Sequence, residues 1–191
     1  MAKEERTAAR DKRERLVSAA VALAYRQGFG LTTLADIAAE SSVPLGNVYY
    51  YFKTREDIRA AILTYRKDQF AQARDRFGAI VSPKERLKAF VDMTVSNADN
   101  VAQKGCPMGT LCAELLKMTD AFSEGAGELL TVPMAWMKEQ FIELGYEKEA
   151  NDLALQLQAG LQGASMVTLS ARDPSLLERE GERLKSWIEA L

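Results

Sequence analysis

Apolar residues recur at intervals of three and four along almost the whole chain, and glycine and proline fall mainly in the breaks between these runs. In the first run, Leu16, Val17, Ala20, Leu23 and Ala24 would lie on one face of a helix. No alternating apolar and polar stretch of strand length stands out, and no repeat of solenoid spacing is visible. The sequence therefore predicts an all-α protein of about nine helices.

Stop and capping signals divide the early part of the chain into helices. Gly28 ends the first helix. Thr32 or Thr33 can cap a short second helix over 34–40, and Asp36 stands where a capping box after Thr33 needs an acidic side chain. These signals predict two helices joined by a short connection.

A third and a fourth helix follow. Pro44 suits the first turn of a short helix over 44–50, and Thr54 caps a long helix over 54–80. Pro133 predicts a kink or a split in one of the later helices. Those later helices are predicted at 83–103, 107–118, 122–144, 147–171 and 174–190.

The chain is predicted to have two functional parts, a DNA-binding domain over 1–53 and an effector-binding and dimerisation domain over 54–191. The helix over 54–80 bridges them. Residues 1–80 contain 14 Lys and Arg against 10 Asp and Glu, whereas residues 81–191 contain 11 against 17. A basic front on an acidic body suggests a local contact with nucleic acid, although chance alone can produce this imbalance.

Several functional classes are excluded by composition. The chain has no histidine and only two cysteines, Cys106 and Cys112, so it lacks the commonest general base and the ligands of an ordinary zinc site. We therefore predict no metal, no cofactor and no catalytic residue. The charged start lacks the apolar core of a signal peptide, and no run approaches the roughly 18 apolar residues of a membrane span. A cytoplasmic protein without a membrane partner is expected.

The segment TTLADIAAESSVPLGNVYYYFKTREDI, residues 32–58, is the most informative part of the chain. Its two short helices are separated by a turn too brief for antiparallel packing, so they must cross. Gly46 leaves the second helix open to close approach. Hydroxyls, an amide and two cations around it suit phosphates and base edges. These residues are Asn47, Tyr49, Tyr50, Tyr51, Lys53 and Arg55.

An alternative is that the aromatic residues of this segment belong to the core. We expect this for Phe52, which should pin the second short helix to its neighbours, and for one of the three tyrosines in part. For Lys53 and Arg55 the alternative is a solvated pair of charges at the start of a helix.

The same segment resembles the helix-turn-helix signature of TetR-type regulators. The resemblance runs from Leu16 to Ile58 and rests on Thr33, Ile37-Ala38, Gly46, Tyr49-Tyr50, Phe52-Lys53, Arg55 and Ile58, in that order and spacing. It implies a recognition helix over Pro44–Tyr50 that lies in the major groove of operator DNA.

Site residues follow from the resemblance position by position. Leu45, Gly46, Asn47 and Tyr50 are implied near the bases, and Thr33, Tyr49, Tyr51, Lys53 and Arg55 at phosphates. Family members often carry histidine where Tyr51 stands and lysine where Leu45 stands, so the base sequence that is read does not carry over. Basic residues before the signature are expected to form an arm with backbone or minor-groove contacts: Arg6, Arg10, Lys12 and Arg13.

The predicted helix over 147–171 contains Gly160 and Gly163, which cost roughly 1 kcal/mol each relative to alanine. A close approach of another helix would explain both. In the regulators that the chain resembles, the last two helices pair with their symmetry mates, so the resemblance implies a homodimer that suits a palindromic operator. Alternatively, these faces pack only within one copy. The implied interface is Leu153, Leu157, Gly160, Leu161, Ala164, Leu177, Leu184, Trp187 and Ile188.

Methionine is concentrated in the body of the chain. Flexible thioethers suit an adaptable apolar chamber, and with aromatic and amide side chains they predict a pocket for a small apolar or aromatic effector. The simpler alternative is that the methionines fill the core. The predicted lining is Phe90, Met93, Cys106, Met108, Leu111, Leu115, Met134, Trp136, Met137, Phe141, Gln158, Gln162 and Met166.

Cys106 precedes Pro107, which fits the first position of a helix, so the thiol would cap that helix. The positive end of the helix dipole favours a thiolate there. Some regulators of the resembled family share a Gly-Cys start to this helix, and a few respond to electrophiles or oxidants. Cys106 is therefore either a sensor, or a structural cap or wall of the pocket. Cys112 lies about 600° further round the helix and faces away.

Three functions can be compared on these features. An enzyme or redox protein using Cys106 lacks a base to activate the thiol. A helical adaptor without DNA binding has no need for Gly46, Tyr49 and Lys53 together. We therefore expect a DNA-binding transcriptional regulator, namely a dimeric repressor that holds double-stranded operator DNA and is released by a small effector.

Overall fold

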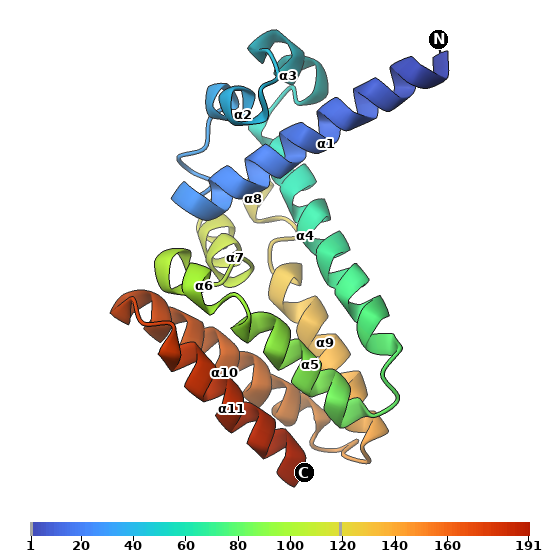
Figure 1. The fold of residues 1–191 in the computed structure, drawn as a ribbon, viewed down its shortest axis with the longest axis vertical. Helices are drawn as coiled ribbons and strands as arrows, with labels where there is room; N and C mark the ends of the chain where they lie inside the picture. The colour runs from blue at the N-terminus through green and yellow to red at the C-terminus, as the bar shows by residue number, and fades with distance from the viewer. Residues whose placement is uncertain (1, 119) are drawn as a thin grey trace. The chain divides into compact units, whose positions relative to one another are not determined.

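The computed structural model describes residues 2–118 and 120–191, with side chains for 10–118 and 121–191. These residues form helices and no strand, as predicted (Figure 1). The helices are Ala2–Gln27 (α1), Leu34–Ser41 (α2), Leu45–Tyr51 (α3), Arg55–Gly78 (α4), Pro83–Val95 (α5), Ala98–Lys104 (α6), Gly109–Leu116 (α7), Asp120–Ser123 (α8), Glu128–Glu143 (α9), Ala150–Ala171 (α10) and Ser175–Ala190 (α11).

Two of the predicted helices are divided in the structure. The helix expected over 83–103 breaks between α5 and α6 at Ser96 and Asn97. The helix expected over 122–144 breaks between α8 and α9, where Gly125 has φ +70° and provides a left-handed turn. Pro133 lies inside α9 and does not split it. The first helix is longer than its apolar pattern, because it begins at Ala2.

The chain forms two compact units. The first contains the chain up to Lys67 and Leu111–Ala126, and the second contains Asp68–Thr110 and Gly127–Leu191. Two helices, α4 and α7, therefore begin in one unit and end in the other.

The first unit has a core of apolar side chains from α1, α2, α3 and the start of α4. Its largest fully buried members include Leu16, Phe29, Ile37, Phe52 and Ile62. In α1 the buried positions follow helical spacing from Leu16 to Ala24, as its sequence predicts. This core fixes α2 and α3 as a pair that crosses near α1 (Figure 1).

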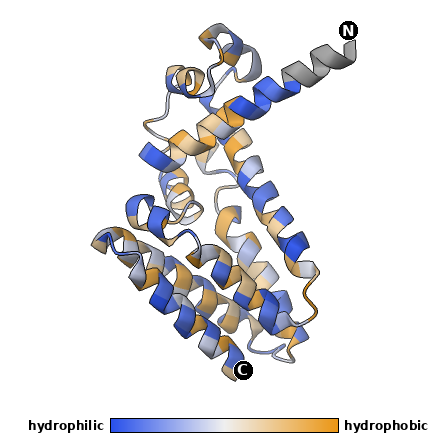
Figure 2. Cartoon of the chain, in the orientation of Figure 1, coloured by the Kyte–Doolittle hydropathy of each residue, from blue (hydrophilic) through white to orange (hydrophobic). Residues whose placement is uncertain are grey.

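The second unit packs α5, α9, α10 and α11 around one apolar cluster. Four aromatic rings pack together at its centre, with Phe90 and Trp136 5.8 Å apart and Phe77 and Trp136 5.4 Å apart. Along α11 the apolar residues turn inward and the charged ones outward, which Figure 2 shows as alternating orange and blue. Among the described residues, no helix combines the length and apolar character needed to cross a membrane.

Candidate nucleic-acid interface

The two short helices are joined by a tight connection. Ser42 has φ 54°, a left-handed conformation that ends α2, and the backbone N–H of Val43 donates to the carbonyl of Ala38 at 3.2 Å. Pro44 then stands at the start of α3. This connection turns the chain within three residues, so α3 crosses α2 as the sequence predicts.

One face of α3 is fixed to the core and the other faces outward. Val48 is fully buried and Phe52, just after α3, is 2% exposed. By contrast, Tyr49 is 53% and Tyr50 79% exposed. Two exposed aromatic side chains on one short helix form an apolar patch, so the outer face of α3 is suited to an interface.

The remaining predicted contact residues surround this face. Leu45 and Gly46 are exposed, and a Cβ atom built on Gly46 meets nothing within 4 Å. Asn47 and Tyr51 are half-buried, so one of the three tyrosines is partly covered as expected. Tyr50 and Tyr51 stack edge to face with ring centres 5.1 Å apart.

Capping interactions hold both ends of this motif. The Thr33 hydroxyl accepts from the backbone N–H of Asp36 at 3.1 Å, and the Asp36 carboxylate accepts from the Thr33 backbone at 3.0 Å. This is the predicted capping box. Hydrogen bonds from the Thr33 hydroxyl and then from its backbone lower the pKa of Asp36 below its ordinary value. The Thr33 hydroxyl is thus engaged in the cap rather than directed only outward.

The start of α4 is held in the same way. The Asp57 carboxylate accepts from the backbone N–H groups of Lys53 at 2.9 Å and Thr54 at 3.0 Å. The bond from Thr54, followed by that from Lys53, lowers the pKa of Asp57. The backbone of Lys53 is therefore fixed while its side chain is exposed.

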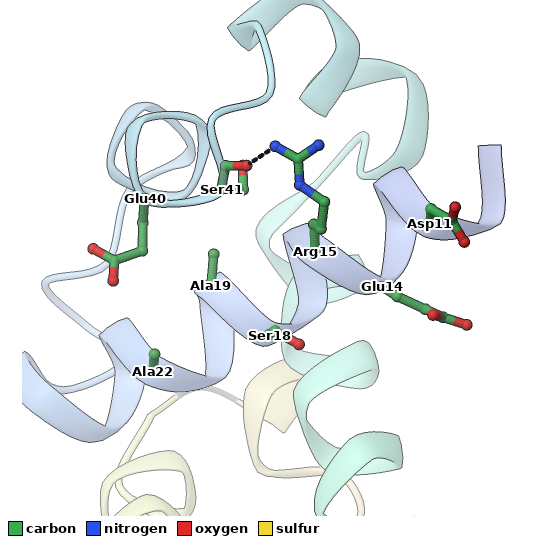
Figure 3. Close-up of a pocket in the computed structure, with 8 residues that line it drawn as sticks. All are labelled: Asp11, Glu14, Arg15, Ser18, Ala19, Ala22, Glu40 and Ser41. Atoms are coloured by element: carbon green, nitrogen blue, oxygen red, sulfur yellow. Dashed lines mark hydrogen bonds between the residues drawn. The ribbon is translucent and has the colours of Figure 1, made fainter. Parts of the chain in front are cut away.

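Arg15 ties the turn between α2 and α3 to α1. Its guanidinium donates to the carbonyl of Ser41, as Figure 3 shows, and to that of Ser42 at 3.2 Å. An ion pair at 3.0 Å between Arg26 and Glu40 adds a second link between α1 and α2. Sequence reasoning missed Arg15 because a basic residue beside an apolar run gives no sign of its partner.

Arg55, for which we predicted a phosphate contact, also binds its own domain. Its Nη2 donates to the carbonyl oxygens of Phe29 at 3.0 Å and Gly30 at 3.2 Å. Its guanidinium also lies 5.1 Å from the centre of the Phe29 ring. These contacts engage part of the Arg55 guanidinium within its own domain, so the exposed Lys53 is the better candidate for a phosphate.

The basic residues before the signature do not form an extended arm, because they belong to α1. Arg10 pairs with Glu14 one turn later at 2.7 Å, which neutralises part of the expected charge. Lys12 and Arg13 are exposed on the same helix. The side chain of Arg6 lies outside the described residues.

The second unit contains a cavity of about 130 Å³ beside Cys106. The sulfur of Cys106 accepts from the backbone N–H of Gly109 at 3.4 Å and from the amide of Gln162 at 3.5 Å. The thiol therefore caps α7 as predicted and faces the cavity. The lining comprises Gly105, Cys106, Gly109, Thr110, Leu130, Gln162, Ser165, Met166 and Leu169.

The predicted effector chamber has a wider lining than this cavity. Only Cys106, Gln162 and Met166 of its residues line the observed one. The apolar cluster of the second unit contains Phe90, Trp136, Met137 and Phe141, and Met108 and Met134 pack against it. Of the others, Leu111, Leu115 and Gln158 are buried and Met93 is exposed.

The predicted dimer positions contribute to packing within one copy. Leu157, Leu161, Leu177, Leu184 and Ile188 are buried. Leu153 and Trp187 pack against the main apolar cluster, and Ala164 packs against a smaller one. Gly160 faces Leu184 of α11, 3.3 Å from a Cβ atom built on it.

The opposite face of α10 is apolar and exposed. Leu155 is 56%, Met166 60% and Val167 55% exposed, and a Cβ atom on Gly163 would meet nothing within 4 Å. Sequence reasoning missed this face because α10 is apolar on both sides, and the pattern does not indicate which side is covered.

Two segments of the sequence match known protein families. Residues 16–62 match the bacterial regulatory proteins of the tetR family, and residues 83–183 match the C-terminal domain described as transcriptional regulator LmrA/YxaF-like. The regulators YxaF and LmrA of Bacillus subtilis (strain 168) are 27% and 26% identical to the chain. These alignments cover 87% of the chain, and 90% and 91% of the two relatives.

The fold is also similar to solved structures. A TetR transcriptional regulator from Legionella pneumophila superposes with a TM-score of 0.81 at 21% identity, over 91% of this chain and 95% of that one. These similarities reject the alternative of a thiol-dependent enzyme. Because the C-terminal match alone spans more than half of the chain and the N-terminal match contains the exposed α3, the chain belongs to the TetR family of DNA-binding transcriptional regulators.

Proposed function

We propose that the protein is a repressor that binds a palindromic operator as a homodimer and is released by a small effector. The observation that carries this proposal is the outward face of α3, where Tyr49 and Tyr50 are exposed while Val48 and Phe52 fix the helix to the core. Such a helix can enter a major groove without rearrangement of its domain. Since the partner is the chromosome, we place the protein in the cytoplasm.

The contacts divide into two kinds. Leu45, Gly46, Asn47 and Tyr50 are proposed to lie near base edges, with Pro44 at the entry to the groove. Thr33, Tyr49, Tyr51 and Lys53 are proposed to contact phosphates and to set the register of the motif on the duplex. Arg55 is left out of this set, because its guanidinium is held by the carbonyls of Phe29 and Gly30.

The homodimer is proposed to form through the exposed face of α10. Leu155, Met166 and Val167 form an apolar patch there, and Gly163 allows the backbone of a second copy to approach. A two-fold axis would bring the same face of both copies together. It would also present two copies of α3 to half-sites separated by about 34–36 Å, one turn of the duplex.

The effector is proposed to be a small apolar or electrophilic molecule that binds beside Cys106. The cavity of about 130 Å³ accepts a small molecule, and the thiol at the start of α7 is positioned to react or to pack. We propose that the bound effector moves α4 as a lever and changes the spacing of the recognition helices. For release, the effector must prefer the form of the protein that does not bind DNA.

The test of DNA binding is a fluorescence titration with the palindromic duplex that the wild-type protein selects from a random library. We expect two chains per duplex and a loss of about tenfold or more for Tyr50→Ala. The matched control is Val81→Ala, which removes an exposed side chain outside α3 and outside the loop that precedes α2. One chain per duplex, or equal affinity for a scrambled sequence, would reject the proposal.

The test of the effector proposal is alkylation with N-ethylmaleimide. We expect modified wild-type protein to lose affinity for the selected duplex and modified Cys106→Ser protein to keep it. Cys112→Ser is the matched control, because it retains the thiol beside the cavity. If modification of Cys106 left duplex affinity unchanged, an electrophilic effector at this position would be rejected.

A further inference from the structure

A carboxylate from α7 is bound by the connection between α1 and α2. Glu114 accepts from the backbone N–H of Phe29 at 2.9 Å and from that of Gly30 at 2.7 Å. All three residues belong to the first unit, although Glu114 is distant from the other two in the chain. One side chain thus satisfies two successive donors of a loop that has no regular structure of its own.

The loop is shaped to receive this carboxylate. A Cβ atom on Gly28 would lie 3.2 Å from Oε1 of Glu114, and one on Gly30 would lie 3.1 Å from it. Gly28 also has φ +90°, a conformation that other residues rarely adopt. Glycine at both positions therefore keeps open the space that the carboxylate occupies.

Arg55 binds the carbonyl groups of the same loop. It donates to the oxygens of Phe29 and Gly30, whose N–H groups Glu114 accepts. The four polar backbone groups of these two residues are therefore all bound by one acidic and one basic side chain. Charge-assisted hydrogen bonds of this kind are stronger than neutral ones and fix the peptide in one orientation.

The fixed loop leads directly into the DNA-binding helices. The Thr32 hydroxyl donates to the carbonyl of Gly28 at 2.8 Å, and Thr33 caps α2. The loop therefore leads into α2, and α2 leads into α3 through a connection of three residues, so the loop adds to the contacts by which the core holds the recognition helix.

We propose that Glu114 is a positioning residue for DNA binding. Without its carboxylate the N–H groups of Phe29 and Gly30 turn to water, and the loop gains conformations in which α3 is misaligned. Binding to a duplex must then restore the single orientation, which weakens affinity without removing any contact with DNA. Glu114 touches the loop only, and it acts on DNA through α2 and α3.

The binding experiment uses the full-length protein and the duplex selected by the wild type. We expect Glu114→Ala to weaken affinity about tenfold, since two charge-assisted bonds are lost and one of the freed groups is exposed to water. Glu114→Gln keeps one acceptor oxygen and should weaken affinity about threefold. Glu139→Gln, which removes the same charge from an exposed position of α9, is the control and should bind as the wild type does.

A spectroscopic readout separates positioning from general loss of stability. The sequence contains two Phe–Gly peptides, Phe29-Gly30 and Phe77-Gly78. Labelling phenylalanine with ¹³C at the carbonyl and glycine with ¹⁵N therefore selects two amide signals. We expect the Gly30 signal to move in Glu114→Ala and Glu114→Gln, while the Gly78 signal stays as an internal reference.

The two readouts together decide the proposal. It is supported if the Gly30 signal moves, the Gly78 signal is unchanged, and duplex affinity falls in both variants, more in Glu114→Ala than in Glu114→Gln. It is overturned if both variants bind the duplex as tightly as the wild type, whatever the Gly30 signal does. It is also overturned if affinity falls while the Gly30 signal stays in place, because the loss then has another origin.

Discussion

The guanidinium of Arg55 lies 5.1 Å from the centre of the Phe29 ring and donates to the carbonyl oxygen of the same residue at 3.0 Å. Lys53, two residues earlier, has an exposed side chain. Two basic residues that are separated by one position in the sequence thus have different surroundings. Their substitution should separate the stability of the first unit from its affinity for DNA.

Replacing Arg55 by alanine should destabilise the first unit. The change removes two hydrogen bonds to carbonyls and the cation–π contacts with the rings of Phe29 and Phe122, which together contribute about 1–2 kcal/mol at a partly exposed site. Urea unfolding followed by circular dichroism measures the difference. Lys53→Ala is the matched control and should unfold as the wild type does. Equal stability of the Arg55 variant and the wild type would show that these contacts contribute nothing.

Replacing Lys53 by alanine should change how DNA binding depends on salt. A lysine that neutralises one phosphate releases about one counterion, so the slope of log affinity against log salt should fall by about one unit. Titrations at several salt concentrations measure this slope. Lys117→Ala removes an exposed lysine at the end of α7 and should leave the slope as it is. An unchanged slope in the Lys53 variant would mean that this side chain does not reach a phosphate.

Replacing Gly46 by alanine should affect binding and stability in opposite directions. A Cβ atom at this position meets nothing in the protein, so the helix gains about 0.5–1 kcal/mol from the loss of a flexible glycine. The added methyl group would hold α3 away from the groove, and affinity should fall about tenfold. Thermal unfolding and duplex titration of the same sample test both effects. Unchanged affinity would place Gly46 outside the interface.

The DNA-binding helices could be predicted from the sequence because their signals are local. The capping box of Thr33 and Asp36 needs only residues three apart, and the burial of Phe52 follows from its place after a short amphipathic helix. The partner of Arg55 could not be predicted in this way. Its hydrogen bonds reach a loop 25 and 26 residues earlier, and nothing in the spacing indicates that a carbonyl group lies there.

The body shows the same limit in its packing. In α10, Gly160 and Gly163 look alike in the sequence, yet one faces Leu184 within the copy and the other faces outward. Helical periodicity identifies two apolar faces but does not say which one the rest of the chain covers. The sequence likewise did not indicate that Phe90 and Trp136 pack against each other within the body.

Introducing glutamate at Val167 should disrupt the proposed homodimer. A two-fold axis would bring two carboxylates into one apolar patch, and we expect the dissociation constant of the dimer to rise about 100-fold. Sedimentation equilibrium measures it. Val81→Glu is the matched control, because Val81 is 91% exposed and lies outside α10. If the dimer of the Val167 variant had the same dissociation constant as that of the wild type, the interface would lie elsewhere.

Acid should weaken the first unit through two capping aspartates. Hydrogen bonds from Thr33 lower the pKa of Asp36, and bonds from Thr54 and Lys53 lower that of Asp57, both from an ordinary value of 3.8. Since each folded-state pKa lies below its unfolded value, the unfolded chain binds more protons in this range. The contribution to stability is therefore complete above about pH 5 and is lost as the pH falls through the folded values.

The pair Asp36→Asn and Asp57→Asn in one protein tests this relation by urea unfolding between pH 5.5 and 3. An asparagine cannot gain the proton, so the free energy of unfolding of the variant should fall less steeply with acid than that of the wild type. Other carboxylates, such as Glu40 paired with Arg26, keep their part of the slope in both proteins. Asp75→Asn, an exposed aspartate of α4, is the control for the substitution itself. Parallel pH curves for the double variant and the wild type would contradict this relation. They would mean that Asp36 and Asp57 stabilise the motif equally well in their charged and neutral forms.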